Sequence, residues 1–304
     1  MNDNKIDAYI IPHEDEYLSE YIPPESERLF WLTNFTGSAG AAIVLQDKAA
    51  IFVDGRYTVQ VKNQVDNLFF EYKHITKESY IEWINTNLTN DKNIGYDSRL
   101  HRAIWVQNTQ KVLSIDLNLV PIAENPIDLF WDDRPIPKSE KAFLLSEEYS
   151  GKQSSIKREE IASHLHDNNI DAAFITQLDS IAWLLNIRGT DVPCNPVLLC
   201  HAIIYKDASL DLFIDLNKIP DGFLKHVGDG VRIHSPEKLH DISKSLSAKN
   251  VLYDMNGSNA YCFQILSKNN VNILNGDDPC VLPKACKNET ELKGMKACHI
   301  RDAI

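Results

Sequence analysis

The residues best suited to chemistry lie in the tetrapeptide Asp54-Gly55-Arg56-Tyr57, which directly follows an apolar run at residues 49–53. Such a run predicts a buried strand, so Arg56 is expected at the strand end or in the turn beyond it. A guanidinium in that place can contact a carboxylate through two parallel hydrogen bonds. From the chemistry alone, the favoured alternative is an internal ion pair, with Asp54 or with a neighbouring domain.

A second candidate cation, Arg188, lies between an apolar segment at residues 183–185 and Gly189. The apolar residues are predicted to belong to a core. Arg188 and the Thr190-Asp191 pair that follows are instead expected at a loop exit facing a neighbouring domain, because functional side chains concentrate on such loops.

Potential metal ligands also occur close together, but their spacing does not favour a metal site. The run His13-Glu14-Asp15-Glu16 cannot readily converge on one ion, since neighbouring side chains point apart in both helices and strands. We therefore expect this run to form a solvated loop after the first strand.

Two pairs of residues on predicted helices could also attract a metal assignment. His299 and Asp302 are three apart and could share a face, but two ligands make only half a site, and a structural salt bridge or domain contact is preferred. His164 and His166 are two apart, face different sides of a helix and are expected at the surface. The sequence thus predicts no metal-ligating residue within this chain.

The glycine-rich segment Gly37-Ser38-Ala39-Gly40 resembles a phosphate-binding loop only superficially. It lacks both the GxGxxG spacing and the Lys-Ser/Thr ending of such loops. We expect a tight turn that needs a positive φ at glycine. The six cysteines are too sparse for a disulfide framework and lack the CxxC pairs of a zinc site, so all are predicted to be reduced thiols.

Bulk composition excludes several classes of protein. With 43% apolar and 24% charged residues over 304 positions, the sequence fits two folded domains. A net charge of -12 argues against a nucleic-acid surface, which needs clustered Lys and Arg. No signal peptide pattern opens the chain, and no apolar run approaches the length of a membrane span. We expect a cytoplasmic protein with no nucleic-acid or membrane partner.

The chain contains a weak internal repeat. Residues 6–8 and 170–172 both read Ile-Asp-Ala before an apolar stretch, and residues 30–37 and 182–189 share the pattern Trp-Leu-x-Asn-x-x-Gly. Two predicted strands follow each of these patterns in the same order. Because the period, about 160 residues, is far above that of a solenoid, we interpret the repeat as a duplicated domain.

Each repeat unit is predicted to be α/β, with a mixed β-sheet flanked by helices. Hairpin signals at residues 46–48 and 206–208 indicate antiparallel neighbours within each sheet. Prolines and acidic residues between positions 125 and 140 disfavour helix or central strand there and place the break between units. The predicted domains are residues 1–140, residues 141–283 and a third beginning within residues 284–304.

Residues 288–304 are predicted to form a helix with an apolar stripe that needs a packing partner. Asn288 is a good N-cap, and Glu291 stands three residues later, as in a capping box. Leu292, Met295 and Cys298 give one apolar stripe, and no turn signal ends the helix before the last residue. We expect more protein to pack on this stripe.

Several of these segments closely resemble aminopeptidase P, in its long three-domain cytosolic form, within the creatinase/prolidase superfamily. The resemblance runs along essentially the whole chain, and its DGRY and NIRGTDVPCNP segments are specific to the family rather than generic. The segments that carry it are residues 31–60, 129–135, 178–199 and 282–303.

The resemblance implies two tandem creatinase/prolidase N-terminal-type domains, followed by the first helix of a pita-bread catalytic domain in which the sequence stops. The implied reaction removes the N-terminal residue from peptides whose second residue is proline. In the family, two divalent ions, usually manganese, are held by the catalytic domain, so the metal ligands are expected beyond Ile304. The fragment is then expected to hold no cofactor and to be inactive alone.

The resemblance also implies roles for the two candidate arginines. In related cytosolic enzymes the arginine of the DGRY motif binds substrate, so Arg56 is the expected substrate-binding residue here. For Arg188, direct contact with substrate and a structural bridge to the catalytic domain both remain open. The implied partners are peptides with proline second, the protein's own catalytic domain and a second copy in a homodimer, and these domains would shape substrate access.

Two other functions remain open at this point. A creatinase-like hydrolase shares the N-terminal fold but typically has one such domain, so the duplication and the DGRY motif count against it. A non-enzymatic binding module, of the kind found in some histone chaperones, keeps a peptidase-like body without metal ligands. The presence or absence of the ligand set in the downstream reading frame would discriminate between them.

Overall fold

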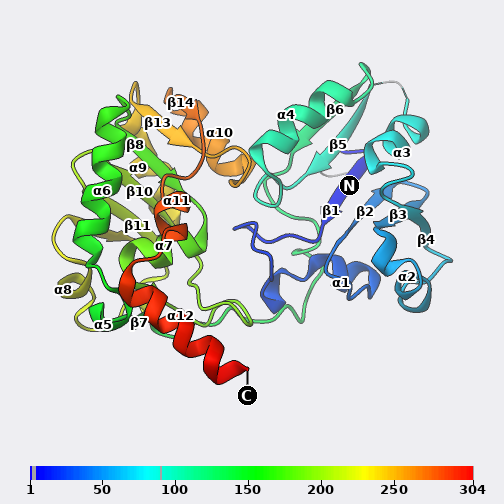
Figure 1. The fold of residues 1–304 in the computed structure, drawn as a ribbon. Coiled ribbons are helices and arrows are strands. Elements are labelled where there is room, and N and C mark those ends of the chain that lie inside the picture. Colours follow the sequence, from blue (N-terminus) through cyan, green and yellow to red (C-terminus); the bar gives the residue numbers. More distant parts are fainter. Residues whose placement is uncertain (2–4, 90, 304) are drawn as a thin grey trace. The chain divides into compact units, whose positions relative to one another are not determined.

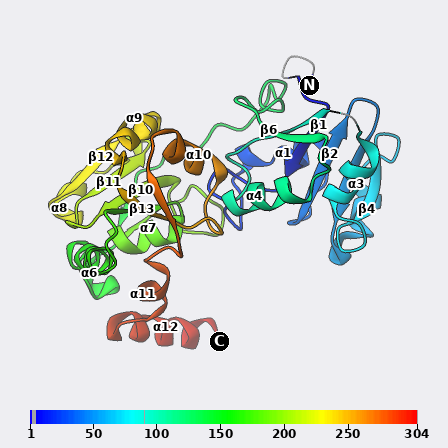
Figure 2. The same cartoon turned by 90° about the horizontal axis from the view of Figure 1, so that it is seen from above.

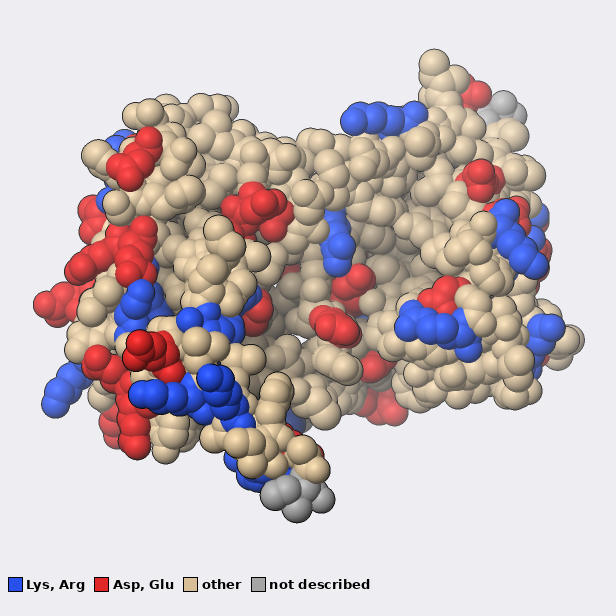
Figure 3. All heavy atoms as spheres, viewed as in Figure 1, with Lys and Arg blue, Asp and Glu red and all other residues tan. Residues whose placement is uncertain are grey.

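The computed structural model describes residue 1, residues 5–89 and residues 91–303, and the chain forms two compact units (Figure 1). The first comprises residues 1–137 with the short segment 259–261, and the second comprises residues 138–258 and 262–304. None of the helices described is both long enough and apolar enough to span a bilayer. On the face drawn in Figure 3, basic and acidic side chains are interspersed.

The first unit is built on one mixed six-stranded sheet, with strands in the order β4-β3-β2-β1-β5-β6. Strand β2 is antiparallel to both β1 and β3, whereas the remaining neighbours are parallel. The strands are β1 (Ala8–Pro12), β2 (Gly40–Leu45), β3 (Ala49–Val53), β4 (Phe70–His74), β5 (Lys92–Tyr96) and β6 (Leu117–Pro121).

Helices bury both faces of this first sheet. Along β1, Ala8 and Ile10 join one apolar cluster while Tyr9 and Ile11 join another, as the twofold period of a strand requires. The Tyr9 cluster includes residues of α1 and α2, and the other cluster includes Trp83 of α3. The helices are η1 (Pro24–Ser26), α1 (Arg28–Thr33), η2 (Gly55–Tyr57), α2 (Gln60–Gln64), α3 (Tyr80–Asn87) and α4 (Ala103–Val112).

The second unit has a sheet of the same size, in the order β12-β11-β10-β8-β13-β14. Figure 2 shows α6 and α7 on one side of it and α9 and α10 on the other. Its strands are β8 (Ala172–Ile175), β10 (Cys200–Tyr205), β11 (Leu210–Ile214), β12 (Val231–His234), β13 (Asn250–Tyr253) and β14 (Asn272–Asn275), while β7 (Phe143–Leu144) pairs separately with β9 (Ile187–Arg188).

The helices of this second half vary widely in length. They are α5 (Glu147–Ser150), α6 (Ser154–Asp167), α7 (Leu178–Leu185), η3 (Leu216–Lys218), α8 (Phe223–Val227), η4 (Pro236–Lys238), α9 (Leu239–Ser243), η5 (Lys244–Leu246), α10 (Ala260–Lys268), α11 (Val281–Ala285) and α12 (Glu289–Asp302). The predicted capping box at Asn288 is confirmed, since its side chain accepts from the Glu291 N–H and Glu291 accepts in return.

The predicted mixed α/β fold is confirmed, and the two sheets share strand order and strand direction throughout. The repeat extends to single hydrogen bonds. Asp7 accepts from the backbone N–H of Asn93 at 2.9 Å, and Asp171 accepts from Asn250 at the same distance. Asn34 and Asn186 each end a helix in the left-handed conformation. These shared details support the duplication of a whole domain.

One further similarity between the two halves of the chain was missed from the sequence. Residues 92–97 read Lys-Asn-Ile-Gly-Tyr-Asp and residues 249–254 read Lys-Asn-Val-Leu-Tyr-Asp, and these segments form β5 and β13. Their last residues, Asp97 and Asp254, each accept a hydrogen bond from the backbone N–H two residues on. The hairpins predicted at residues 46–48 and 206–208 are confirmed, since they connect β2 with β3 and β10 with β11. In the second of them, Ala208 lies in the left-handed region at φ 65°.

The prediction of positive φ at Gly37 and Gly40 is wrong, because neither glycine lies in the left-handed region. Space is what excludes a side chain there. An added Cβ on Gly37 would lie 2.2 Å from the ring of Phe35, and one on Gly40 would lie 3.2 Å from both that ring and the carbonyl of Phe52. Close packing against a buried aromatic ring therefore accounts for both glycines.

Two buried histidines make the stability of the fold depend on pH. Burial lowers the pKa of His101 to about 3 and that of His201 to about 4. An unfolded histidine binds a proton below about pH 6.5 while the native one stays neutral, so stability falls as pH drops below that value. The slope is about 1.4 kcal/mol per pH unit for each histidine.

We expect His101→Phe to remove one of these two contributions. His101 stacks on Trp105 at 4.0 Å, which phenylalanine can also do. Urea unfolding at pH 7.5 and at pH 5.0 should show a pH-dependent loss smaller by about 2 kcal/mol than in the unmodified protein. His166→Asn is the control, since that side chain is 76% exposed. An unchanged pH dependence in His101→Phe would contradict the prediction.

Candidate functional site

Arg56 lies where the sequence predicted, in the single 3-10 turn η2 that follows β3. Its guanidinium forms an ion pair with Asp54, in which Nη2 donates to Oδ2 at 2.6 Å and Nε donates to both carboxylate oxygens at 3.1 Å. The Arg56 side chain is 66% exposed. The ion pair with Asp54, favoured from chemistry alone, is therefore present, and it stands in solvent.

The surroundings of Arg56 hold its guanidinium in one place. It lies 5.1 Å over the ring of Tyr57. Tyr57 itself packs edge-on against Phe35 and shares a 2.7 Å hydrogen bond with the hydroxyl of Ser38. Hydrogen bonds from Arg56 hold the pKa of Asp54 below its usual range. An incoming carboxylate would have to compete with Asp54, or bind the Nη1 group, for which no hydrogen bond to the described residues is present.

The duplicated unit shows that the turn does not need an arginine. At the matching place after β11, Asp215 accepts from the backbone N–H of Asn217, as Asp54 accepts from that of Arg56. Asn217 occupies the position of Arg56. The backbone turn is thus preserved without a cation, and the Arg56 side chain is available for another role.

The sequence suggested a loop exit for Arg188, but the structure places this residue at the end of a short strand. It is the second residue of β9 and pairs with Phe143 of β7. Its Nη1 donates to the carbonyls of Ala182 at 2.9 Å and Ile187 at 2.8 Å. Burial lowers the pKa of Arg188, while the charge of Glu291 acts in the opposite direction. A short strand pair and the end of α7 therefore fix this side chain.

Arg188 lines a cavity of about 410 Å³ within the second unit. The walls come from α5, α7, the segment 195–197, residues 284–287 and α12. Three cations and two carboxylates are among the lining residues, together with the rings of Trp183 and Tyr149. The sequence singled out Arg188 as a candidate, whose role stays a prediction, but gave no sign of this cavity.

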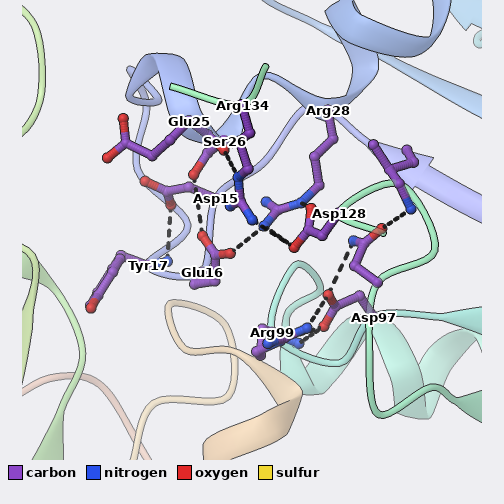
Figure 4. A network of polar contacts seen from close by, with 12 residues as sticks. Asp15, Glu16, Tyr17, Glu25, Ser26, Arg28, Asp97, Arg99, Asp128 and Arg134 are labelled. Atoms are coloured by element: carbon purple, nitrogen blue, oxygen red, sulfur yellow. Dashed lines mark hydrogen bonds and ion pairs between the residues drawn. The ribbon is translucent and has the colours of Figure 1, made fainter. Parts of the chain in front are cut away.

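A buried charge network in the first unit was missed by sequence reasoning (Figure 4). Its centre is Arg28, whose side chain is 2% exposed. Arg28 donates from Nη2 to Glu16 at 2.6 Å and from Nε to Asp128 at 2.7 Å. Arg134 approaches the other oxygen of Asp128 at 2.9 Å. No local pattern could reveal this cluster, because Arg28 and Asp128 are 100 residues apart.

The network corrects the expectation of a solvated loop at residues 13–16. Asp15 is fully buried and accepts from the backbone N–H groups of Tyr17 and Ser19, both at 2.9 Å. Burial raises the pKa of Glu14 to about 7. The loop is polar in composition, yet it is not fully solvated, since Asp15 is buried, residues 13, 14 and 16 are half-buried, and Glu16 contacts Arg28.

A second carboxylate–guanidinium pair lies close to this network. Asp97 is 1% exposed and is bound by Arg99, with Nη2 donating to Oδ2 at 2.8 Å. The amide of Asn125 donates to the same oxygen at 3.2 Å. These contacts join the ends of β5 and the segment after β6, so the polar residues fix loops rather than enclose a ligand.

The residues described bring together no group of three or more His, Cys, Asp and Glu side chains able to hold a metal ion. Asp302 contacts Arg301 at 3.1 Å and the thiol of Cys298, while His299 is exposed. His164 and His166 are also exposed, as expected. The six cysteines are free thiols, of which three are buried. The donor set for a two-metal centre is thus not found in this part of the protein.

Comparison with known proteins agrees with this architecture. Residues 1–129 and residues 133–291 each match the creatinase/prolidase N-terminal domain family. A probable Xaa-Pro aminopeptidase P of Penicillium rubens is 35% identical over 316 residues, covering 99% of this chain and 51% of the relative. Xaa-Pro aminopeptidase 1 of Dictyostelium discoideum is 33% identical over 319 residues, covering 100% of this chain and 50% of the relative.

A solved structure gives the same result. The X-prolyl aminopeptidase from Caenorhabditis elegans, described as a cytosolic enzyme with a di-nuclear active site, matches with a TM-score of 0.90 at 29% identity. The match covers 98% of this chain and 50% of that chain. The present chain spans about half the length of the curated relatives it matches. The resemblance to aminopeptidase P is confirmed, and the chain belongs to the creatinase/prolidase N-terminal domain family, whose domain it contains twice in tandem.

Proposed function

We propose that this chain is the two-domain, N-terminal part of an Xaa-Pro aminopeptidase, which releases the first residue of peptides whose second residue is proline. One observation carries the proposal. The match to the Caenorhabditis elegans enzyme extends over 98% of this chain at a TM-score of 0.90, so both units correspond to parts of that enzyme. The complete protein would act in the cytoplasm, as that relative does.

The proposal assigns the metal chemistry to another part of the protein. A dinuclear centre of two divalent cations, manganese in our proposal, would activate water and stabilise negative charge on the scissile carbonyl oxygen. Nothing among the described residues fits such a centre, so no reaction step is assigned to them. A catalytic domain that begins within residues 284–304 would supply the ligands.

In this proposal, the two units control which peptides reach the reaction and support a homodimer. The exposed guanidinium of Arg56 would bind the substrate, in exchange for part of its contact with Asp54. Helix α12 would pack against the catalytic domain through apolar side chains such as Leu292, which is 44% exposed. Because the protein is acidic, we expect it to bind neither nucleic acid nor membranes.

Two proteins test whether the metal chemistry resides outside these two units. The full-length gene product should hydrolyse an Xaa-Pro peptide after loading with manganese, and the 304-residue chain should not exceed a no-protein control. The binding-module alternative would be supported if the full-length protein showed no turnover and its natural sequence lacked the metal ligands. Turnover by the 304-residue chain would contradict the assignment of the chemistry to a separate domain.

The role of Arg56 gives a prediction of its own. In the full-length enzyme, Arg56→Ala should raise KM for peptides by about tenfold, because a charge-assisted contact to the substrate is lost. Arg56→Lys should have a smaller effect, since it keeps the charge but not the two-pronged geometry. Lys62→Ala, which removes an exposed cation from α2, is the control. Kinetics unchanged from Lys62→Ala in a folded Arg56→Ala protein would contradict the role.

A further inference from the structure

The cavity beside Arg188 has the features of a small-molecule site. Its volume, about 410 Å³, lies within the range of natural ligand pockets. Such pockets combine mainly apolar walls with a few fixed polar groups. Here the apolar lining residues include Trp183, Val197 and Met295, and Arg188 is one of five charged residues that line the same cavity.

Arg188 resembles Arg158 in donating to backbone carbonyls rather than to a carboxylate. Arg28, Arg99 and Arg232 each hold a carboxylate in a direct ion pair. Arg188 makes no ion pair with the described residues, and only its Nη1 group donates, to two carbonyls. A guanidinium has five N–H donors in a planar fork. The Nε and Nη2 edge is therefore left to donate, and this edge has the geometry that pairs with a carboxylate.

The charges around the cavity also favour an anion. Lys284 is neutralised by its contact with Asp179, and Glu291 accepts at 2.9 Å from the backbone N–H of Asn288, at the start of its own helix. Glu291 thus already serves the capping box of α12. Glu291 keeps its negative charge, which acts on Arg188, yet the lining residues still hold three cations against two carboxylates. An anionic ligand would complete the balance.

The apolar wall is held rigid by a second buried cation. The ammonium of Lys157 stands 4.5 Å over the ring of Trp183 and donates to the Trp183 carbonyl at 3.0 Å. Trp183 is 9% exposed, and the cavity receives what remains accessible. A fixed aromatic wall next to a fixed guanidinium is a pairing that suits a ligand with one apolar and one charged end.

Gly294 marks the rim of the cavity on α12. Glycine inside a helix is destabilising relative to alanine. An added Cβ at Gly294 would have no atom within 4 Å, so packing among the described residues does not require glycine there. Gly294 is therefore a position at the rim where a larger side chain can be introduced to narrow the cavity.

We propose that this cavity binds a carboxylate carried on an apolar group, with the Nε and Nη2 edge of Arg188 pairing with the carboxylate and Trp183, Val197 and Met295 enclosing the apolar group. The inference stands on the cavity alone and does not depend on the peptidase proposal. Two sources share this chemistry, the C-terminal residue of a short peptide and a free apolar acid.

Calorimetric titration of the 304-residue chain tests the proposal. The probes are 3-phenylpropionate and the uncharged 3-phenylpropionamide, which differ only in the carboxylate. We expect saturable binding of the acid, and binding of the amide weaker by about tenfold or more. A tripeptide with a free C-terminal phenylalanine distinguishes the sources, because a peptide site should bind it more tightly than the acid, and a site for free acids should not.

Two variants keep the test decisive. Arg188→Gln should weaken binding of the acid by about tenfold or more and leave the amide unchanged. Gly294→Leu should abolish binding of both probes by filling the rim, and it favours the helix, so it should fold even if Arg188→Gln does not. Incorporated fluorotryptophan at Trp183 reports the place of binding by NMR. No binding at millimolar probe, or binding unaffected by Gly294→Leu, overturns the proposal.

Discussion

Replacing Arg28 with alanine should lower the free energy of unfolding of the first unit by about 3–5 kcal/mol. Arg28 is 2% exposed and holds two carboxylates, Glu16 at 2.6 Å and Asp128 at 2.7 Å. Without the guanidinium, Asp128 keeps Arg134 and Glu16 keeps the hydroxyl of Ser26, while the two carboxylates are only 23% and 26% exposed. Removing one member of a buried pair costs more than the pair contributes, because the partner stays charged and buried.

The first unit can be followed separately in this experiment. Four of the five tryptophans, at positions 31, 83, 105 and 131, belong to it, so denaturant unfolding followed by fluorescence reports mainly this unit. Lys92→Ala is the matched control in the same unit, since Lys92 is 43% exposed beside Asp7 and should cost less than about 1 kcal/mol. A loss of stability in Arg28→Ala as small as in the control would show that the network contributes little.

The sequence predicted the local structure well because local structure has local causes. The hairpins, the Asn288 capping box and the Trp-Leu-x-Asn-x-x-Gly helix ends each depend on residues within one turn of each other. The repeat carried this further, since it indicated that both halves follow one topology. What the repeat could not give was the strand order, which comes from pairing between residues far apart, such as Ala8 with Ile94.

The site was harder to predict for the same physical reason. Arg56 was singled out because it follows a predicted strand within the DGRY motif, and its ion pair with Asp54 could be anticipated because it spans two residues. The Arg28 network joins residues 100 positions apart and reverses the expectation that a run of acids is solvated. The Arg188 cavity needs α12 and α7 to meet, more than 100 residues apart in the chain. Charged side chains acquire their roles from tertiary neighbours, which composition and spacing do not reveal.

The segment NIRGTDVPCNP has a structural role in the second unit. Gly189 has no room for a side chain, since an added Cβ would lie 2.4 Å from Leu198. Asp191 is 3% exposed and accepts from the backbone N–H of Leu199 at 2.7 Å. These residues fix the segment on both sides of Arg188's cavity wall at 195–197. The motif therefore positions the cavity whether or not its arginine binds a ligand.

Asp191→Ala should accordingly destabilise the second unit by about 3–5 kcal/mol. The Asp191 carboxylate accepts at 2.6 Å from Lys218, and the two side chains are 2% and 5% exposed. Alanine would leave the Lys218 ammonium buried without its carboxylate. The segment at residues 191–199 would also lose the hydrogen bond that Leu199 donates to Asp191.

The pair of Asp241 with Lys244 provides the matched control for Asp191→Ala. It has a similar N–O distance, 2.8 Å, but its side chains are 59% and 56% exposed. Asp241→Ala should therefore cost no more than about 0.5 kcal/mol. The double variant Asp191→Leu/Lys218→Met should recover part of the loss, because it removes both buried charges together. Unfolding followed by the fluorine NMR signal of fluorotryptophan at Trp183, which is resolved from those of the four tryptophans of the first unit, measures all three variants. A double variant no more stable than Asp191→Ala would show that the hydrogen bond to Leu199, rather than the buried charge, dominates.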